Sequence, residues 1–172
     1  DMNKNFQITQ YDVPLGVEGL LKLENKEIKL KRIHLEEDPG SLVHPGGMQK
    51  SSYVSVDYNR AGMPLCEIVT EADLESPEEA RDFLRKLISV ISYLGIYDSN
   101  KNPIKVDANI SIKEKGYTKV EIKNISGFKE VETALLNEVD RQKNSKKIEQ
   151  ETRAWDSNKG ITFSLRQKEE DI

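Results

Sequence analysis

The feature that most constrains the fold is a pair of neighbouring segments, residues 105–113 and 117–123, in which apolar and polar residues alternate. Because successive side chains of a β-strand point to opposite faces, the alternation predicts an antiparallel hairpin with one apolar and one polar face. Helices covering the apolar face would leave the polar residues facing solvent or lining a cleft. The apolar set is Val106, Ala108, Ile110, Ile112, Val120 and Ile122, and the polar set is Asp107, Asn109, Ser111, Lys119, Glu121 and Lys123.

Two segments have the 3.6-residue apolar spacing of helices that bury one face. The first predicted helix spans about residues 76–94, because Ser76 can cap its start and Glu79 completes a capping box. Gly95 follows at the position that favours a left-handed residue. The second predicted helix spans about residues 128–142.

The remaining periodic segments read as strands separated by Gly, Pro, Asn and Asp. The predicted strands are residues 17–23, 28–36, 53–58, 64–70, 105–113, 117–123, 149–155 and 161–166. Strands outnumber helices, so we expect an α+β fold in which helices back an antiparallel β-sheet. The 172 residues suffice for one compact domain with its own core.

Composition excludes several classes of protein. No segment approaches the roughly 20 apolar residues of a membrane span, and no apolar leader opens the chain, so we expect a cytoplasmic protein with no membrane partner. A single cysteine, Cys66, excludes a disulfide framework and a cysteine metal cluster, and its apolar neighbours indicate a core thiol. The net charge of −4, with 26 Lys and Arg, neither indicates nor excludes RNA binding.

An acidic segment, residues 32–40, is the first candidate site. Strand alternation places Arg32, His34, Glu36 and Asp38 on one face. Two carboxylates about 4 Å apart repel by roughly 4 kcal/mol at an effective dielectric of 20, so their convergence favours a bound cation. Oxygen-rich sites select hard ions such as magnesium. The alternative is a solvated strand end with ordinary surface acids.

Two further polar groups are candidates. Arg60, in a strand-to-turn segment, can clamp a phosphate or carboxylate, and its alternative is an exposed turn arginine. The polar hairpin face offers acids for a metal, a lysine for phosphate and amides for orientation, and its alternative is a solvated hairpin surface. His34 and His44 lack the spacing of a zinc site or a catalytic triad, and no glycine-rich phosphate loop is present.

A series of ordered segments also resembles a known family. The matching segments are residues 6–15, 32–40, 57–69, 76–80, 107–111, 121–124, 141–142 and 150–156. Together they resemble the B subunit (GatB) of the aspartyl/glutamyl-tRNA amidotransferases and its archaeal relative, GatE. The resemblance extends over nearly the whole chain.

The resemblance implies a fold related to the glutamine synthetase and guanido kinase core, an antiparallel cradle for ATP and magnesium. It implies a ligase that forms carbon–nitrogen bonds with glutamine as amido donor. ATP would phosphorylate the side-chain carboxylate of Asp-tRNA(Asn) or Glu-tRNA(Gln), and glutamine-derived ammonia would then give Asn-tRNA or Gln-tRNA. The implied partners are the amidase subunit of a heterotrimer, which supplies ammonia, its small third subunit, and the misacylated tRNA.

The resemblance also assigns roles to residues by motif. The implied catalytic residues are Glu36, Glu37, Asp38, Arg60 and Lys123. The implied ATP-binding residues are Arg60, Asn109, Lys123 and Asn124, and the implied metal ligands are Glu36, Asp107 and Glu121. The family's leading segment, which supplies further metal ligands, and its downstream helical and tail domains, which grip tRNA, lie outside the catalytic domain that we expect residues 1–172 to form. We therefore expect an incomplete metal site and weak tRNA binding.

Two alternatives stay open. In the first alternative, the chain is a scaffold that docks partner subunits and tRNA and does not itself transfer a phosphoryl group. It can also be of the GatE type, specific for glutamyl-tRNA, although the insertion expected of that type is not seen.

Overall fold

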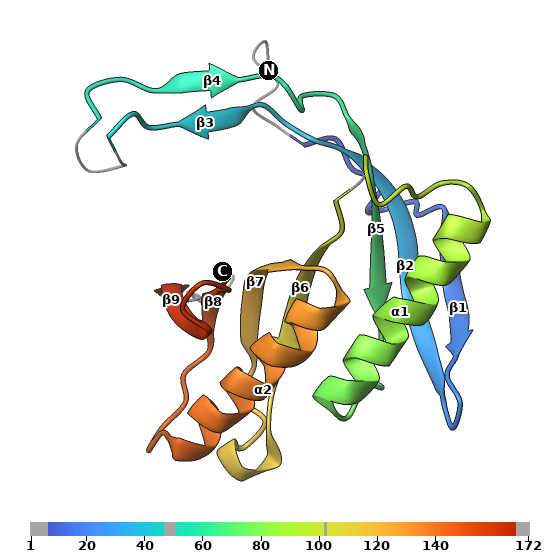
Figure 1. Ribbon diagram of the computed structural model, residues 1–172, viewed down its shortest axis with the longest axis vertical. Helices are drawn as coiled ribbons and strands as arrows, with labels where there is room; N and C mark the ends of the chain where they lie inside the picture. Colours follow the sequence, from blue (N-terminus) through green and yellow to red (C-terminus); the bar gives the residue numbers. More distant parts are fainter. Residues whose placement is uncertain (1–6, 47–50, 102, 168–172) are drawn as a thin grey trace. The chain divides into compact units, whose positions relative to one another are not determined.

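A computed structural model describes residues 7–46, 51–101 and 103–167 of the chain (Figure 1). The chain divides into two compact units, Asp1–Asp73 and Leu74–Ile172. The described residues combine two α-helices with mainly antiparallel sheets, which agrees with the α+β class expected from the sequence. Among these residues, no helix has the length and apolar character needed to cross a membrane. The single catalytic domain over residues 1–172 stays a prediction.

The first unit is built from a three-stranded antiparallel sheet of order β1-β2-β5 and a separate β3–β4 ribbon (Figure 1). Its strands are β1 (Gly16–Lys22), β2 (Glu27–Glu37), β3 (Ser41–Val43), β4 (Ser55–Asp57) and β5 (Pro64–Thr70). The predicted strands 17–23, 28–36 and 64–70 are confirmed to within about a residue. The predicted strand 53–58 contracts to β4, and its partner β3 was not predicted.

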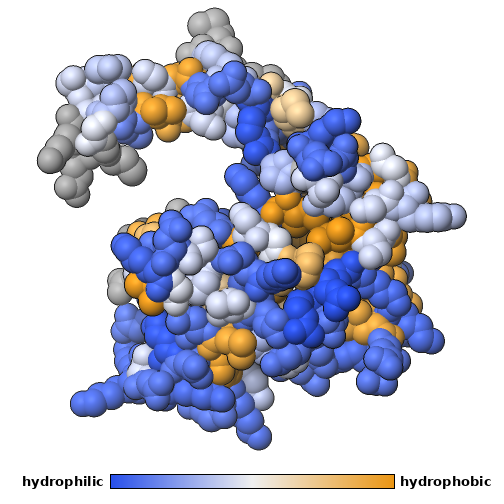
Figure 2. All heavy atoms as spheres, in the orientation of Figure 1, coloured by the Kyte–Doolittle hydropathy of each residue, from blue (hydrophilic) through white to orange (hydrophobic). Residues whose placement is uncertain are grey.

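The β3–β4 ribbon is largely exposed. All three residues of β3 are exposed, so the strand has no buried face. A strand without a buried face lacks the apolar alternation by which a sequence reveals a strand. Leu42 and Val54 keep about half of their surface accessible, at 51% and 47%. Figure 2 shows hydrophobic atoms on the surface over this ribbon.

The interpretation of Cys66 as a core thiol is wrong, because Cys66 is exposed. Strand β5 pairs with β2 so that Cys66 lies opposite Leu35, whereas the next residue, Glu67, lies opposite the buried His34. Alternation along both strands therefore sends Cys66 to the more exposed face of the sheet. Partial burial still raises the pKa of its thiol.

The second unit consists of two helices and a four-stranded sheet of order β6-β7-β8-β9. Its elements are α1 (Pro77–Tyr93), β6 (Lys105–Ile110), a 3₁₀ turn (Lys113–Lys115), β7 (Val120–Ser126), α2 (Phe128–Asn144), β8 (Glu151–Asp156) and β9 (Ile161–Gln167). Both predicted helices are present. The predicted strand 105–113 ends at Ile110, before the 3₁₀ turn, and the predicted strand 117–123 is found three residues later as β7. The predicted strands 149–155 and 161–166 correspond to β8 and β9.

The sheet of the second unit is not wholly antiparallel. Strands β7 and β8 run parallel, because helix α2 carries the chain back across the sheet between them. The pairs β6–β7 and β8–β9 are antiparallel. The crossover places the first residues of β8 directly beside the polar residues of β7.

The start of α1 has the predicted cap. The Ser76 side chain accepts a hydrogen bond of 3.1 Å from the backbone N–H of Glu79. The Glu79 carboxylate in turn accepts a bond of 2.8 Å from the backbone N–H of Glu75. Gly95, after the helix, has the expected left-handed conformation with φ of +72°. Near its start α1 is tied to α2 by Arg81, which donates to the Glu132 carboxylate at 2.8 Å.

Helix α2 covers the apolar face of the sheet, as the alternation predicted. The β7 residues Val120, Ile122 and Ile125 are fully buried, and Val131 and Ala134 of α2 are 1% and 0% exposed. Burying a side chain of this size is worth about 1.5–3 kcal/mol, so these contacts fix which residues of β7 face outward.

Strand β7 contains one extra residue that its alternation alone does not predict. Val106 pairs with Ile125 and Ala108 with Ile122, so that two residues of β7, Lys123 and Asn124, lie opposite one residue of β6. Asn124 takes the left-handed conformation with φ of +67°. This bulge shifts the alternation by one residue and turns Ile125 into the core.

We predict that two substitutions at Asn124, which is exposed, differ in their effect on stability. Asn124→Val places a β-branched residue at positive φ and should lower the free energy of unfolding by about 1–2 kcal/mol. Asn124→Gly adopts this conformation freely and should leave stability within about 1 kcal/mol of wild type. Urea unfolding of both variants measures the difference. An equal loss in both would contradict a role for backbone conformation.

Candidate functional site

The first unit brings a histidine and two carboxylates together. His34 Nε2 lies 3.1 Å from Glu36 Oε1 and 2.8 Å from Glu67 Oε2. The strand register places His34 opposite Glu67, and Glu36 follows two residues later on the same face of β2. One donor atom from each residue lies within 4.8 Å of the others, a spacing that a metal ion can bridge.

The segment before β1 covers this histidine cluster. Glu36 accepts hydrogen bonds from Gln7 Nε2 at 2.7 Å and Thr9 Oγ1 at 3.1 Å. The Tyr11 ring meets His34 edge-on with centroids 6.3 Å apart, and the Arg32 guanidinium lies 4.4 Å from the centroid of the Tyr11 ring. His34 is wholly buried as a result.

The cluster includes a residue that sequence reasoning missed. Glu67 was read only as part of an apolar strand, and its alignment with His34 depends on the register of β2 and β5. Local sequence does not specify which residues of two strands lie side by side. The available signal was the placement of Glu67 within the matching segment 57–69.

The three adjacent acids Glu36, Glu37 and Asp38 do not form one group. Alternation along β2 turns Glu37 to the face opposite Glu36. Asp38 follows the strand, where its Oδ2 accepts bonds from Arg60 Nε at 3.0 Å and Nη2 at 2.6 Å. The predicted residues Asp38 and Arg60 are thus an ion pair, and the predicted alignment of Asp38 with Glu36 is not seen as a contact among the described residues.

The second unit brings three predicted residues together on the polar face of the β6–β7 hairpin. Lys123 Nζ lies 3.2 Å from Asp107 Oδ2 and 3.6 Å from Glu121 Oε1. Partial burial lowers the pKa of Lys123, but the hydrogen bonds and charges of Asp107 and Glu121 raise it by more than burial lowers it. The net pKa of Lys123 is therefore above its ordinary value. The lysine therefore stays a cation at neutral pH.

The two predicted amides flank this group. Asn109 pairs with Glu121 across the hairpin, and Asn124 lies in the bulge directly after Lys123. Thr152 of β8, which was not predicted, donates its hydroxyl to Glu121 Oε2 at 3.0 Å. The predicted site residues therefore lie on both units. Glu36, Glu37, Asp38 and Arg60 are on the first unit, where they form no single group, and Asp107, Asn109, Glu121, Lys123 and Asn124 are on the second.

A buried polar network explains other residues of the matching segments. Glu138 of α2 is fully buried, and its carboxylate accepts bonds from Arg141 at 2.6 and 2.9 Å, Gln142 at 3.0 Å and Thr162 at 2.9 Å. Burial alone would raise the pKa of Glu138, but the bonds from Arg141, Gln142 and Thr162 lower it below the ordinary value. The network fastens α2 to β9.

Arg153 extends the network to β8. Its guanidinium donates to Glu151 at 2.8 Å and to the Thr162 hydroxyl at 3.0 Å. Glu138 occupies the apolar stripe of α2, at the spacing of Val131, Ala134 and Leu135, and this is the signal by which the sequence could have revealed a buried acid. These residues hold α2, β8 and β9 together.

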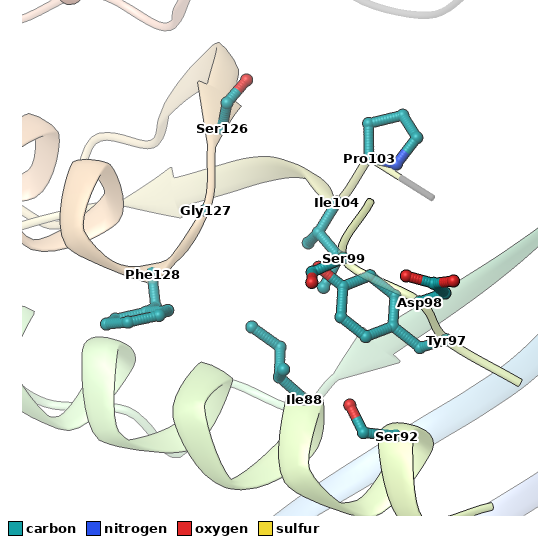
Figure 3. A pocket seen from close by; sticks show the side chains of 10 residues that line it. All are labelled: Ile88, Ser92, Tyr97, Asp98, Ser99, Pro103, Ile104, Ser126, Gly127 and Phe128. Carbon is teal, nitrogen blue, oxygen red and sulfur yellow. The ribbon is translucent and has the colours of Figure 1, made fainter. Parts of the chain in front are cut away.

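A separate hollow of about 780 Å³ lies in the second unit (Figure 3). Its walls come from α1, from Tyr97–Ser99 and from the start of α2, where Phe128 faces Ile88. None of the predicted site residues lines it. It is therefore distinct from the polar hairpin face.

Comparison with known proteins extends the sequence resemblance. The family model described as the GatB/GatE catalytic domain matches residues 1–172. The B subunit of the aspartyl/glutamyl-tRNA(Asn/Gln) amidotransferase from Methanospirillum hungatei is 51% identical over 99% of this chain and 38% of its own length. The proteins of that name from Methanoregula boonei and Carboxydothermus hydrogenoformans are 50% and 46% identical over 98% and 99% of this chain. The chain thus spans about two fifths of the length of these relatives.

We predict that the contribution of Glu138 to stability depends on pH. Because its folded-state pKa is lowered, the contribution is present above the ordinary glutamate pKa and is lost as pH falls through the folded-state value. Glu138→Gln should lower the free energy of unfolding by about 3 kcal/mol at pH 7. The difference from wild type should shrink in acid, as measured by urea unfolding at a series of pH values. A difference independent of pH would contradict an ionised Glu138.

Proposed function

The chain belongs to the GatB/GatE catalytic-domain family, and on this premise we propose that it performs the ATP-dependent step of a tRNA-dependent amidotransferase. In this step ATP phosphorylates the side-chain carboxylate of Asp-tRNA(Asn) or Glu-tRNA(Gln). Glutamine-derived ammonia then displaces the phosphate to give Asn-tRNA or Gln-tRNA. The protein is thereby part of a carbon–nitrogen ligase with glutamine as amido donor.

One observation carries this proposal above all others. A lysine cation lies between two carboxylates on an accessible β-hairpin face, where Lys123 is 38% and Asp107 51% exposed. Carboxylate oxygens are the ligands that magnesium prefers, and a lysine ammonium is a common partner of phosphate. The same three residues thus supply the two kinds of group that a nucleotide with its metal needs.

The donor chemistry of the described residues fits a divalent cation. Asp107 and Glu121 offer oxygen donors on the second unit, and Glu36 offers one beside His34 and Glu67 on the first. Magnesium, when bound, neutralises charge on the phosphates. We assign Glu36 on the first unit and, separately, Asp107 and Glu121 on the second unit as residues that would hold magnesium.

The chain's own residues then have separable tasks. Asp107 and Glu121 would hold the cation, and Lys123, which lies beside both carboxylates, would pair with phosphate oxygens. Arg60 holds phosphate or substrate carboxylate with the planar fork that now binds Asp38. The amides of Asn109 and Asn124 orient the nucleotide by hydrogen bonds.

The remaining parts of the proposal concern the assembly. Glu37 and Asp38 belong to the metal site or to the path of ammonia. An amidase and a small third protein act as partners in the cytoplasm and complete a heterotrimer, and the misacylated tRNA is the substrate. We further propose that the fold is related to the glutamine synthetase and guanido kinase core, in which an antiparallel sheet cradles ATP and magnesium.

The first test is Glu36→Gln in the intact protein, reconstituted with its partner subunits. ATP hydrolysis that depends on magnesium and aspartyl-tRNA should fall to background, because an amide binds a metal ion far more weakly than a carboxylate. Complex assembly, measured by size-exclusion chromatography, should be unchanged. Hydrolysis is measured by phosphate release.

Glu114→Gln is the matched control, since Glu114 is an exposed acid in the 3₁₀ turn outside both polar groups. It should hydrolyse ATP like wild type. Full hydrolysis by Glu36→Gln would make the acidic strand structural. It would favour instead a scaffold that docks its partner proteins and tRNA.

A further inference from the structure

We propose that Thr152 is a positioning residue that fixes the carboxylate of Glu121 for metal binding. This inference rests on the proposed function, because it assigns a partner to a residue of the same site. Thr152 itself touches neither nucleotide nor tRNA in this proposal. It acts through the hydroxyl group that it directs at Glu121.

The two oxygens of the Glu121 carboxylate contact different groups. Oε2 accepts the Thr152 hydroxyl at 3.0 Å, whereas Oε1 faces Lys123 Nζ at 3.6 Å. A carboxylate held from one side by a neutral donor presents its other oxygen in a fixed direction. That direction is toward the side of the hairpin on which Lys123 meets Asp107.

Burial makes the contact from Thr152 dependable. Thr152 is 1% exposed, so water cannot replace its partner, and an unpaired buried hydroxyl would cost about 1–3 kcal/mol. Its β-branched side chain also has few rotamers. The hydroxyl is therefore held on Glu121 rather than shared among several acceptors.

The fold supplies the rigidity that a positioning residue needs. Because β7 and β8 are parallel neighbours, Glu121 pairs directly with Thr152. The next residue, Arg153, points to the opposite face and is tied to Thr162 and Glu151. Strand β8 is thus held by the Arg153 contacts on one face, while Thr152 donates to Glu121 on the other face.

Loss of the hydroxyl should weaken metal binding more than it weakens the fold. Hydrogen-bond partners that orient metal ligands typically change metal affinity by about 10–100-fold when removed. Thr152→Val keeps the shape of the side chain without its donor. Thr152→Ser keeps the donor.

The experiment is a titration of the intact protein with Mn²⁺, followed by electron paramagnetic resonance. The quantity to compare is the Mn²⁺ binding that wild type shows and Glu121→Gln lacks. Thr152→Val should weaken this part by about 10–100-fold, and Thr152→Ser should restore most of it. In parallel, the KM for magnesium in ATP hydrolysis should rise more than kcat falls. In a protein that already carries Glu121→Gln, the further substitution Thr152→Val should leave Mn²⁺ binding unchanged.

Thr162→Val is the matched control. Thr162 is also a buried threonine, 6% exposed, whose hydroxyl donates to a carboxylate, that of Glu138 at 2.9 Å. It lies in the structural network, so its substitution should lower the unfolding temperature and leave Mn²⁺ affinity unchanged.

Unchanged Glu121-dependent affinity in Thr152→Val would overturn the positioning role and leave the proposed function standing. Equal losses of affinity in Thr152→Val and Thr162→Val would also overturn it, since general loosening would then be the cause. Should Thr152→Val not fold, Thr152→Ala removes the same donor with a smaller side chain. Absence of any Glu121-dependent binding in wild type would overturn the metal site and the positioning role together.

Discussion

The burial of β7 beneath α2 is the interaction on which the second unit depends. Val120, Ile122 and Ile125 are fully enclosed, and together they bring several kcal/mol of hydrophobic stabilisation. Because side chains alternate along a strand, this burial directs Glu121 and Lys123 to the other face. The polar group on that face is a consequence of how the apolar face packs.

The same helix also determines which strand lies beside the polar residues. By crossing the sheet, α2 brings β8 in parallel to β7 and sets Thr152 next to Glu121. The Glu138 network then fastens the helix to the strands that follow it. Core, crossover and buried polar contacts therefore act together to hold one carboxylate in place.

Local sequence patterns predicted the elements well, and they failed where the outcome depends on contacts between distant residues. The Ser76 cap and the alternation around Ile122 are local, and both were confirmed, although the Glu79 carboxylate accepts from Glu75 N–H rather than from the Ser76 N–H of a capping box. The exposure of Cys66 and the pairing of Glu67 with His34 depend on the register of β2 and β5, which no local pattern encodes. The bulge at Asn124 follows from the need to bury Ile125, which breaks the two-residue period.

The arrangement around Lys123 determines which form of a ligand this face attracts. One ammonium between two carboxylates leaves this group of three side chains with an excess of one negative charge, so the group by itself repels a bare anion at short range. In the proposed function, an anion that brings a cation with it would neutralise the acids and free the lysine. The three side chains would thereby favour a metal-bound anion over a bare one, before shape or base identity is read.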